Sequence, residues 1–382
     1  MEILVTEAHT PAALAAVREL GEAGCYVVAA AGRKTAALGL FSRHASEKIF
    51  LPDTQSESTY EESLLDLLGG MRHQWGRKPI LLACGLRTQA LAARHPKQFA
   101  LECHYLGPGR DELALGEDKR RLEKAAAELG VAMPAELKFD GAEDITELAR
   151  RTDYPAVLKY WGGEKLGLPP ERRVFTAQSS SALAVRYTRM YDVQSPVILQ
   201  KFIPGDSICV AGVLDADSRP VSLFTYKRVR QHGGVGTFYD SMPPGGVTAA
   251  AAGLFSRIGM RGLVMAEFRG DAENFTLIDI NTRLWRGFPL SRRSRAGLAL
   301  SYALAAAGEE LPLSTGNGYR TGVRAQDFLA DLRAALGGHS GKRGKAVAEV
   351  IRAARDKSVF SLIREKGDGK VTRAWLKSIV GR

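Results

Sequence analysis

The stretch Arg261–Arg283, RGLVMAEFRGDAENFTLIDINTR, decides the fold of this chain. An apolar run ends at Glu267, a polar turn follows, and a second apolar run carries Asp279 and Asn281. Two such runs around a polar turn predict an antiparallel β-hairpin. Because side chains alternate along a strand, Asp279 and Asn281 share one face, and the partner strand brings Glu267 beside them. Two carboxylates and an amide oxygen predict a site for Mg²⁺ held together with substrate phosphates. The alternative is a solvated hairpin face.

This order of residues resembles the metal-binding hairpin of the ATP-grasp superfamily, whose members include D-alanine:D-alanine ligase, biotin carboxylase and carbamoyl-phosphate synthetase. The motif here is Asp279-Ile280-Asn281-Thr282-Arg283, twelve positions after Glu267, with Asp where the family usually has Glu. The resemblance implies that Arg283 contacts phosphate in catalysis. It also implies ATP and Mg²⁺, as two ions, with Mn²⁺ as an alternative metal.

Composition places the chain among globular proteins. It has 382 residues, of which 45% are hydrophobic and 25% charged, and this balance is typical of a soluble protein. The start MEILVTEAHTP is acidic, and apolar runs are short, so we expect neither a signal peptide nor a transmembrane helix.

The cysteines are far apart and predict buried thiols in a reducing cytoplasm; they are Cys25, Cys84, Cys103 and Cys209.

The net charge of +11 comes mostly from the C-terminal part of the chain. Residues 318–382 hold 15 Lys and Arg against 6 Asp and Glu, a balance of +9. The other residues are nearly neutral, so nucleic acid is not the predicted partner. An apolar helical face there has two alternative roles, docking on the protein itself or peripheral contact with anionic lipid at the inner membrane surface. The face consists of Val371, Trp375, Leu376 and Ile379.

The N-terminal part follows a strand, helix, strand pattern. Glu2–Glu7 and Cys25–Ala31 are strand-like, and the alanine-rich segment Ala12–Ala23 lies between them. This spacing predicts a βαβ unit and a parallel sheet. The turn after the first strand contains no glycine, which argues against dinucleotide binding.

With the resemblance, these patterns predict an α/β protein. A Rossmann-like domain is followed by a two-lobed ATP-grasp domain of α+β lobes and then by a basic helical extension. The predicted boundaries are 1–113 for the first domain, 114–310 for the second, with lobes 114–195 and 196–310, and 311–382 for the extension.

Two lysines are the candidate phosphate contacts. Lys119 stands in the first turn of a predicted helix, where the helix dipole disfavours a cation unless an anion is bound nearby. Lys159 ends a short strand and precedes a loop with Gly162 and Gly163. Both segments are similar to the nucleotide-binding segments of ATP-grasp proteins, which implies that the lysines and the glycine loop contact the ATP phosphates.

The segment SPVILQKFIPGD resembles the strand that joins the two lobes in the family. The resemblance implies that its backbone at Lys201 and Ile203 contacts adenine. Ser207 stands where the family often has a ribose-binding acid, so Asp206 is the candidate for that contact. The nucleotide-binding residues expected in this segment are Gln200, Lys201, Phe202, Ile203 and Asp206.

Further cations surround the predicted hairpin. Lys227 or Arg230, before a glycine turn, is expected over the γ-phosphate and the acyl phosphate, and a solvated basic turn is the alternative. Downstream arginines predict either a pocket for an anionic substrate or a solvated helix face. They are Arg286, Arg292, Arg293 and Arg295.

The resemblance implies an ATP-dependent ligase. Such an enzyme joins a carboxylate to an amine or a thiol through an acyl phosphate and releases ADP and phosphate. The alternative is a nucleotide-binding regulatory or scaffold protein with little turnover, which the departures at Lys201, Ser207 and Asp279 favour.

Overall fold

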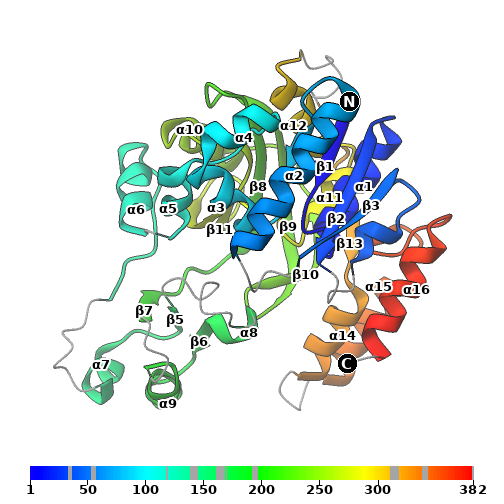
Figure 1. The fold of residues 1–382 in the computed structure, drawn as a ribbon. Coiled ribbons are helices and arrows are strands. Elements are labelled where there is room, and N and C mark those ends of the chain that lie inside the picture. The colour runs from blue at the N-terminus through cyan, green and yellow to red at the C-terminus, as the bar shows by residue number, and fades with distance from the viewer. Residues whose placement is uncertain are drawn as a thin grey trace.

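The computed structural model describes most of the chain. The described residues are 1–32, 37–52, 57–117, 119–137, 145–160, 168, 170–191, 197–309, 318–337 and 343–380. They form three sheets with helices packed around them (Figure 1).

The N-terminal part forms a four-stranded parallel sheet in the order β3-β2-β1-β4, which confirms the predicted parallel sheet. Helix α1 follows β1 because Thr10 accepts a hydrogen bond from the Ala13 amide and Pro11 suits the first helical position. The strands are β1 (Glu2–Val5), β2 (Tyr26–Gly32), β3 (Glu47–Leu51) and β4 (Ile80–Leu82). The helices are α1 (Pro11–Glu22), η1 (Leu38–Phe41), α2 (Glu57–Trp75), α3 (Leu86–Arg94) and α4 (Pro96–Glu102).

A three-stranded antiparallel sheet in the order β6-β5-β7 forms a small lobe. Because β7 begins at Val197 and belongs to this sheet, the sheet extends past the predicted lobe boundary at residue 195. In Figure 1 this lobe lies at the lower left, apart from the parallel sheet. Its elements are α7 (Ile145–Arg151), β5 (Ala156–Tyr160), α8 (Pro170–Arg173), β6 (Val174–Ala177), α9 (Ser180–Tyr191) and β7 (Val197–Lys201).

The third sheet has seven strands in the order β12-β11-β8-β9-β10-β13-β14. It contains the predicted hairpin as β11 and β12, which pair antiparallel. Its strands are β8 (Asp206–Leu214), β9 (Pro220–His232), β10 (Val235–Ser241), β11 (Gly262–Gly270), β12 (Phe275–Asn281), β13 (Arg324–Gln326) and β14 (Val359–Ser361).

The two faces of this sheet are covered differently. Along β11, Val264 and Ala266 pack with residues of α5 (Arg110–Glu117), α6 (Lys119–Glu128) and α10 (Gly246–Arg257). Leu263 and Met265 face the other way, toward α11 (Phe288–Arg293), α12 (Leu298–Ala307) and the N-terminal domain. Since Glu267 follows Met265 by two positions, it points to this second side.

The C-terminal segment, residues 318–337 and 343–380, is integrated into the fold. It adds β13 and β14 to the seven-stranded sheet, so it is more than a helical extension. Val371 is buried in the same core as α1 and α12, which supports docking of the last helix on the protein itself. Leu376 is half exposed, and the side chain of Ile379 lies outside the described residues. Its helices are α14 (Phe328–Gly337), α15 (Arg343–Arg355) and α16 (Gly369–Val380).

The cysteines are buried thiols, as predicted. None of the helices in the described ranges is long and apolar enough to cross a membrane.

Candidate active site

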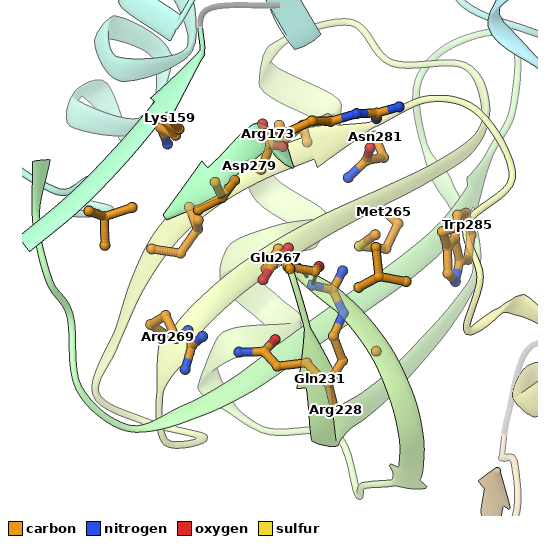
Figure 2. A pocket seen from close by; sticks show the side chains of 18 of the residues that line it. Lys159, Arg173, Arg228, Gln231, Met265, Glu267, Arg269, Asp279, Asn281 and Trp285 are labelled. Atoms are coloured by element: carbon orange, nitrogen blue, oxygen red, sulfur yellow. Dashed lines mark hydrogen bonds and ion pairs between the residues drawn. The ribbon is translucent and has the colours of Figure 1, made fainter. Parts of the chain in front are cut away.

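A cavity of about 660 Å³ lies between the small lobe and the second side of the seven-stranded sheet. Its walls come from β5, β6 and β7, from the turn between β9 and β10, from the β11–β12 hairpin and from the loop after that hairpin (Figure 2). Nine of the predicted site residues line it. They are Lys159, Gln200, Lys201, Phe202, Ile203, Glu267, Asp279, Asn281 and Arg283.

The strand register brings the predicted metal-binding residues together. Glu267 on β11 lies directly opposite Asp279 on β12, and Asn281 lies opposite Met265. A bulge follows Glu267 in this pairing, so Leu277 and Ile280 are both buried although they are three positions apart. The bulge therefore lets β12 bury two apolar side chains on one side of the sheet and direct Asp279 and Asn281 to the other.

The Glu267 carboxylate has two partners within the sheet. Arg228 Nη1 lies 2.7 Å from Glu267 Oε2, and the Ser207 hydroxyl donates to Glu267 Oε1 at 3.2 Å. Arg228 Nη1 also donates to the carbonyl of Gly234 at 3.2 Å. Burial lowers the pKa of Arg228, but the neighbouring Cys209 and Glu267 outweigh this effect and hold that pKa well above the ordinary value. Arg228 therefore remains a cation beside the candidate metal site.

The chemistry of the donor set fits a hard cation that is shared with phosphate. Within the described residues, no group of three or more His, Cys, Asp or Glu side chains is placed to hold a metal ion by itself. Glu267 and Asp279 supply two carboxylates and Asn281 an amide oxygen, so the remaining ligands would come from a bound phosphate and water.

The opposite wall carries the predicted nucleotide contacts. Lys159 is 7% exposed and lies on β5 next to β7. The backbone amide of Lys201 donates to the carbonyl of Ala135 at 3.2 Å. This amide is therefore already bonded within the protein. The side chain of Lys119 and the residues Gly162 and Gly163 lie outside the described residues.

Three predicted residues do not line the cavity. Lys227 points away from it and pairs with Asp206 at 3.4 Å, and both side chains are substantially exposed. Arg230 is held by Asp331 on α14. Alternation along β9 turns Arg228 into the cavity and its neighbour Lys227 away from it. Arg230 follows Arg228 by two positions, and a register shift in the pairing with β10 lies between them. Asp206 therefore has no support as a ribose contact.

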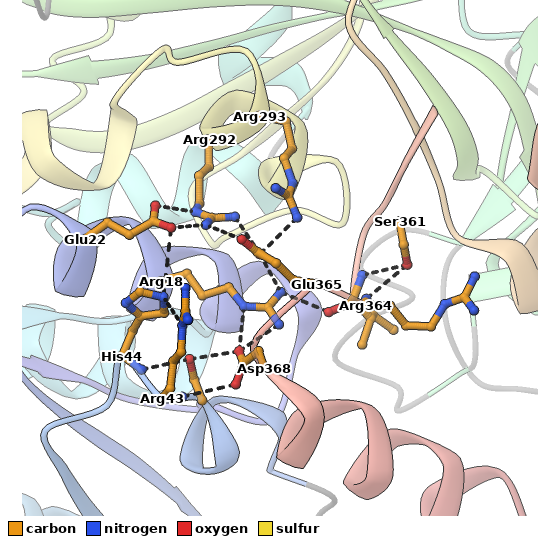
Figure 3. A network of polar contacts seen from close by, with 12 residues as sticks. Arg18, Glu22, Arg43, His44, Arg292, Arg293, Ser361, Arg364, Glu365 and Asp368 are labelled. Carbon is orange, nitrogen blue, oxygen red and sulfur yellow. Dashed lines mark hydrogen bonds and ion pairs between the residues drawn. The ribbon is translucent and has the colours of Figure 1, made fainter. Parts of the chain in front are cut away.

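The arginines after the hairpin have mostly structural partners. Arg292 pairs with Glu22 and Glu365, and Arg293 pairs with Glu365 at 2.9 Å (Figure 3). Arg286 lines the cavity and pairs with Asp327, and Arg295 does not line it. The predicted anionic-substrate pocket therefore reduces to Arg286.

Other cavity residues were not predicted from the sequence. Arg228 lies between Lys227 and Arg230, the two predicted cations. Alternation along the strand places it on the opposite side from Lys227, but it does not show which side faces the cavity. Trp285 lies two positions after the hairpin motif, and its indole nitrogen is buried with no hydrogen-bond partner among the described residues. The unpredicted lining residues with polar side chains include Arg173, Arg228, Gln231, Arg269 and Trp285.

Comparison with known proteins agrees with this architecture. No protein-family model matches the chain. The large chain of carbamoyl phosphate synthase from Haemophilus ducreyi is 23% identical over 263 residues, which are 64% of this chain and 22% of that protein. The present chain thus spans about a fifth of this curated relative.

Several solved structures share the fold. The biotin carboxylase of Campylobacter jejuni, in complex with β-γ-ATP, superposes with a TM-score of 0.63 and 16% identity over 85% of this chain and 74% of its own. The biotin carboxylase domain of 2-oxoglutarate carboxylase from Hydrogenobacter thermophilus, with MgADP and bicarbonate, superposes with a TM-score of 0.60 and 16% identity, over 85% of this chain and 73% of its own. An L-amino acid ligase from Bacillus licheniformis superposes with a TM-score of 0.56 and 14% identity, over 84% of this chain and 77% of its own.

The chain shares its fold with these biotin carboxylase and amino acid ligase structures. The resemblance of its hairpin motif to the ATP-grasp superfamily agrees with this shared fold.

Proposed function

We propose that this protein is an ATP-dependent ligase that joins a carboxylate to an amine, or to a thiol, through an acyl phosphate. The observation that carries the proposal is the convergence of Lys159, the pair Glu267 and Asp279, and Arg283 on one cavity. Lys159 belongs to the three-stranded sheet, Glu267 and Asp279 belong to the seven-stranded sheet, and Arg283 lies in the loop after β12. Their convergence supports a bound triphosphate between the lobes, with the small lobe on one side and the hairpin on the other.

The proposed reaction has two steps. A substrate carboxylate oxygen attacks the γ-phosphorus of ATP, the bond to the β,γ-bridging oxygen breaks, and ADP leaves. The amine then attacks the acyl carbon, orthophosphate leaves with the bonding electrons, and the amine releases a proton. Such phosphoryl transfer depends on positioning and on charge neutralisation. We assign Lys159, Arg228 and Arg283 to the phosphates, because each of them lines the cavity.

We assign Glu267, Asp279 and Asn281 to Mg²⁺. A bound Mg²⁺ would neutralise part of the phosphate charge and orient the triphosphate. Binding requires the Glu267 carboxylate to exchange its pairing with Arg228 for the metal, at least at one oxygen. Arg228 would then be available to the phosphate, which keeps both charges compensated.

The products test the proposal. With Mg-ATP, the correct acid and hydroxylamine in place of the amine, the enzyme should form a hydroxamate in step with ADP, because an acyl phosphate reacts with hydroxylamine. A panel of amino acids and other small carboxylates supplies the candidates. Formation of AMP and pyrophosphate would contradict the assignment of these residues to the terminal phosphate.

The pairing of Glu267 with Arg228 also favours a second candidate function, a nucleotide-binding regulatory protein with little turnover. In this case MgADP binds, but no acid of the panel increases ADP release. A substrate-dependent rise in ADP release excludes this candidate.

A contact of the basic C-terminal segment with anionic lipid is a separate proposal from the sequence. The burial of Val371 in the core works against it, because the apolar face of α16 is then partly used within the protein. Co-sedimentation with vesicles of phosphatidylserine and phosphatidylcholine tests it, and no binding above that to neutral vesicles would exclude it.

A further inference from the structure

The turn between β9 and β10 forms one wall of the candidate active site. All six residues 231–236 line the cavity. Gly233 and Gly234 both have positive φ, at 55° and 79°, which matches a two-residue hairpin turn that only glycine adopts easily. Gly234 lies next to Val174 of β6, and its carbonyl accepts from Arg228. The turn therefore reaches toward the small lobe and toward the candidate metal site.

A buried carboxylate of the C-terminal segment joins the two strands below this turn. Asp331 on α14 is 2% exposed. It accepts from Arg230 Nη2 of β9 at 2.5 Å and from the Thr237 hydroxyl of β10 at 2.8 Å. The side-chain amide of Gln326 donates to the same carboxylate at 2.8 Å. One carboxylate thus connects β9, β10 and β13.

A second acid in the same segment connects this hairpin with the loop after β12. The backbone amide of Asp327 donates to the carbonyl of Thr237 at 2.8 Å. Its carboxylate, 5% exposed, pairs with Arg286 in the cavity wall. Residues 326–331 therefore contact two separate parts of the cavity wall.

We propose that Asp331 and Asp327 are positioning residues of the candidate active site. They hold the β9–β10 turn and Arg286 where they face a bound nucleotide, and neither carboxylate itself lines the cavity. Arg230 is part of this positioning contact. The effect on nucleotide binding rests on the proposed function, whereas the effect on the turn does not.

Asp331→Asn tests the proposal, because it removes the charge and keeps the size of the side chain. Amide hydrogen exchange in peptides that cover 231–236 should become at least about tenfold faster, since the stem of the turn loses its charged bridge. The dissociation constant for MgADP should rise about tenfold, which corresponds to about 1.4 kcal/mol.

Asp356→Asn is the matched control. Asp356 also lies in the C-terminal segment and pairs with Arg324 at 3.0 Å, but both side chains are 39% exposed and neither residue lines the cavity. This variant should leave turn exchange and MgADP affinity within about twofold of the unmodified protein.

The outcomes separate the two proposals. A folded Asp331→Asn protein with a lower melting temperature but unchanged exchange at 231–236 overturns the positioning role, whatever the protein binds. Faster exchange in the turn with no binding of MgADP by the unmodified protein supports the positioning of the turn and overturns the proposed function. Faster exchange with unchanged MgADP affinity overturns the link between the turn and the nucleotide.

If Asp331→Asn does not fold, Thr237→Val takes its place. It removes one donor to the Asp331 carboxylate and preserves the shape of the side chain. Exchange at 231–236 should rise about threefold, in line with the loss of one hydrogen bond to a charged group. Exchange equal to that of the unmodified protein would overturn the proposal.

Discussion

We expect Glu19 on α1 to make the free energy of unfolding depend on pH, through its contact with helix α12. Its Oε1 accepts from the amides of Ala299 and Leu300 at 2.7 and 3.0 Å, while Oε2 is buried without a hydrogen-bond partner among the described residues. Burial raises the pKa of this carboxyl from the ordinary 4.5 to about 7, against the opposing effect of the two amides and of Arg292. Between pH 4.5 and about 7 the carboxyl is therefore mostly ionised in the unfolded chain and mostly protonated in the folded protein, so folding takes up a proton.

This raised pKa sets the sign and the size of the effect. The folded state binds the proton more tightly than the unfolded state, so the contribution to stability is fully present below pH 4.5 and is lost as the pH rises toward 7. One pKa unit corresponds to about 1.36 kcal/mol, so the rise in the pKa of Glu19 from 4.5 to about 7 corresponds to about 3 kcal/mol of stability. Glu19→Gln keeps an oxygen for Ala299 and Leu300 and cannot ionise, so it should remove this loss.

The assay is urea unfolding at a series of pH values between 5 and 8. We expect the free energy of unfolding of Glu19→Gln, relative to the unmodified protein, to increase by up to about 3 kcal/mol from the acidic to the alkaline end. Glu62→Gln is the control, because Glu62 is exposed on α2. A constant difference between Glu19→Gln and the unmodified protein across this range would refute the reasoning.

Three further predictions concern the site and its support. Asp279→Asn should lower turnover at least about 100-fold with an unchanged melting temperature, because one metal-binding carboxylate is lost; normal turnover in this assay would remove the hairpin from the mechanism. Lys159→Ala should depress hydroxamate formation and full turnover alike, and a defect in full turnover alone would assign the lysine to the amine. Arg18→Met leaves Asp368 buried without its 2.8 Å partner, so denaturant unfolding should show a loss of about 3–5 kcal/mol, and a loss below about 1 kcal/mol would contradict this.

The sequence predicted the central hairpin well because local chemistry determines it. A polar turn between two apolar runs leaves few alternatives to an antiparallel pair, and alternation then places Asp279 beside Glu267. The parallel N-terminal sheet was predictable for a similar reason, since strand, helix and strand follow one another within a short stretch.

The positions of the cations could not be predicted in the same way. Lys227, Arg228 and Arg230 are nearly equivalent in sequence, and the register of β9 with β8 and β10 decides which one faces the cavity. Their partners are also distant, because Asp331 lies about a hundred residues after Arg230. A pattern of neighbouring residues contains no information about such long-range pairs.

The C-terminal segment gave the least reliable prediction. Its basic composition and helical periodicity indicated an appendage, whereas β13 pairs with β10 and carries the sheet on to β14. Three-residue strands such as these are too short to give a periodic signal.

The late position of β13 in the chain has a consequence for biosynthesis. By the time a ribosome has added Gly287, every described residue of the cavity lining has been made, but the outer edge of β10 still lacks its partner strand. An unpaired edge of this kind invites pairing with other chains. Until residues 324–331 emerge, the nascent protein therefore has every described side chain of the cavity lining, but it lacks both the strand that pairs with the edge of β10 and the Asp331 carboxylate. Translational pausing or premature termination between residues 287 and 324 should yield chains that aggregate rather than chains with partial activity.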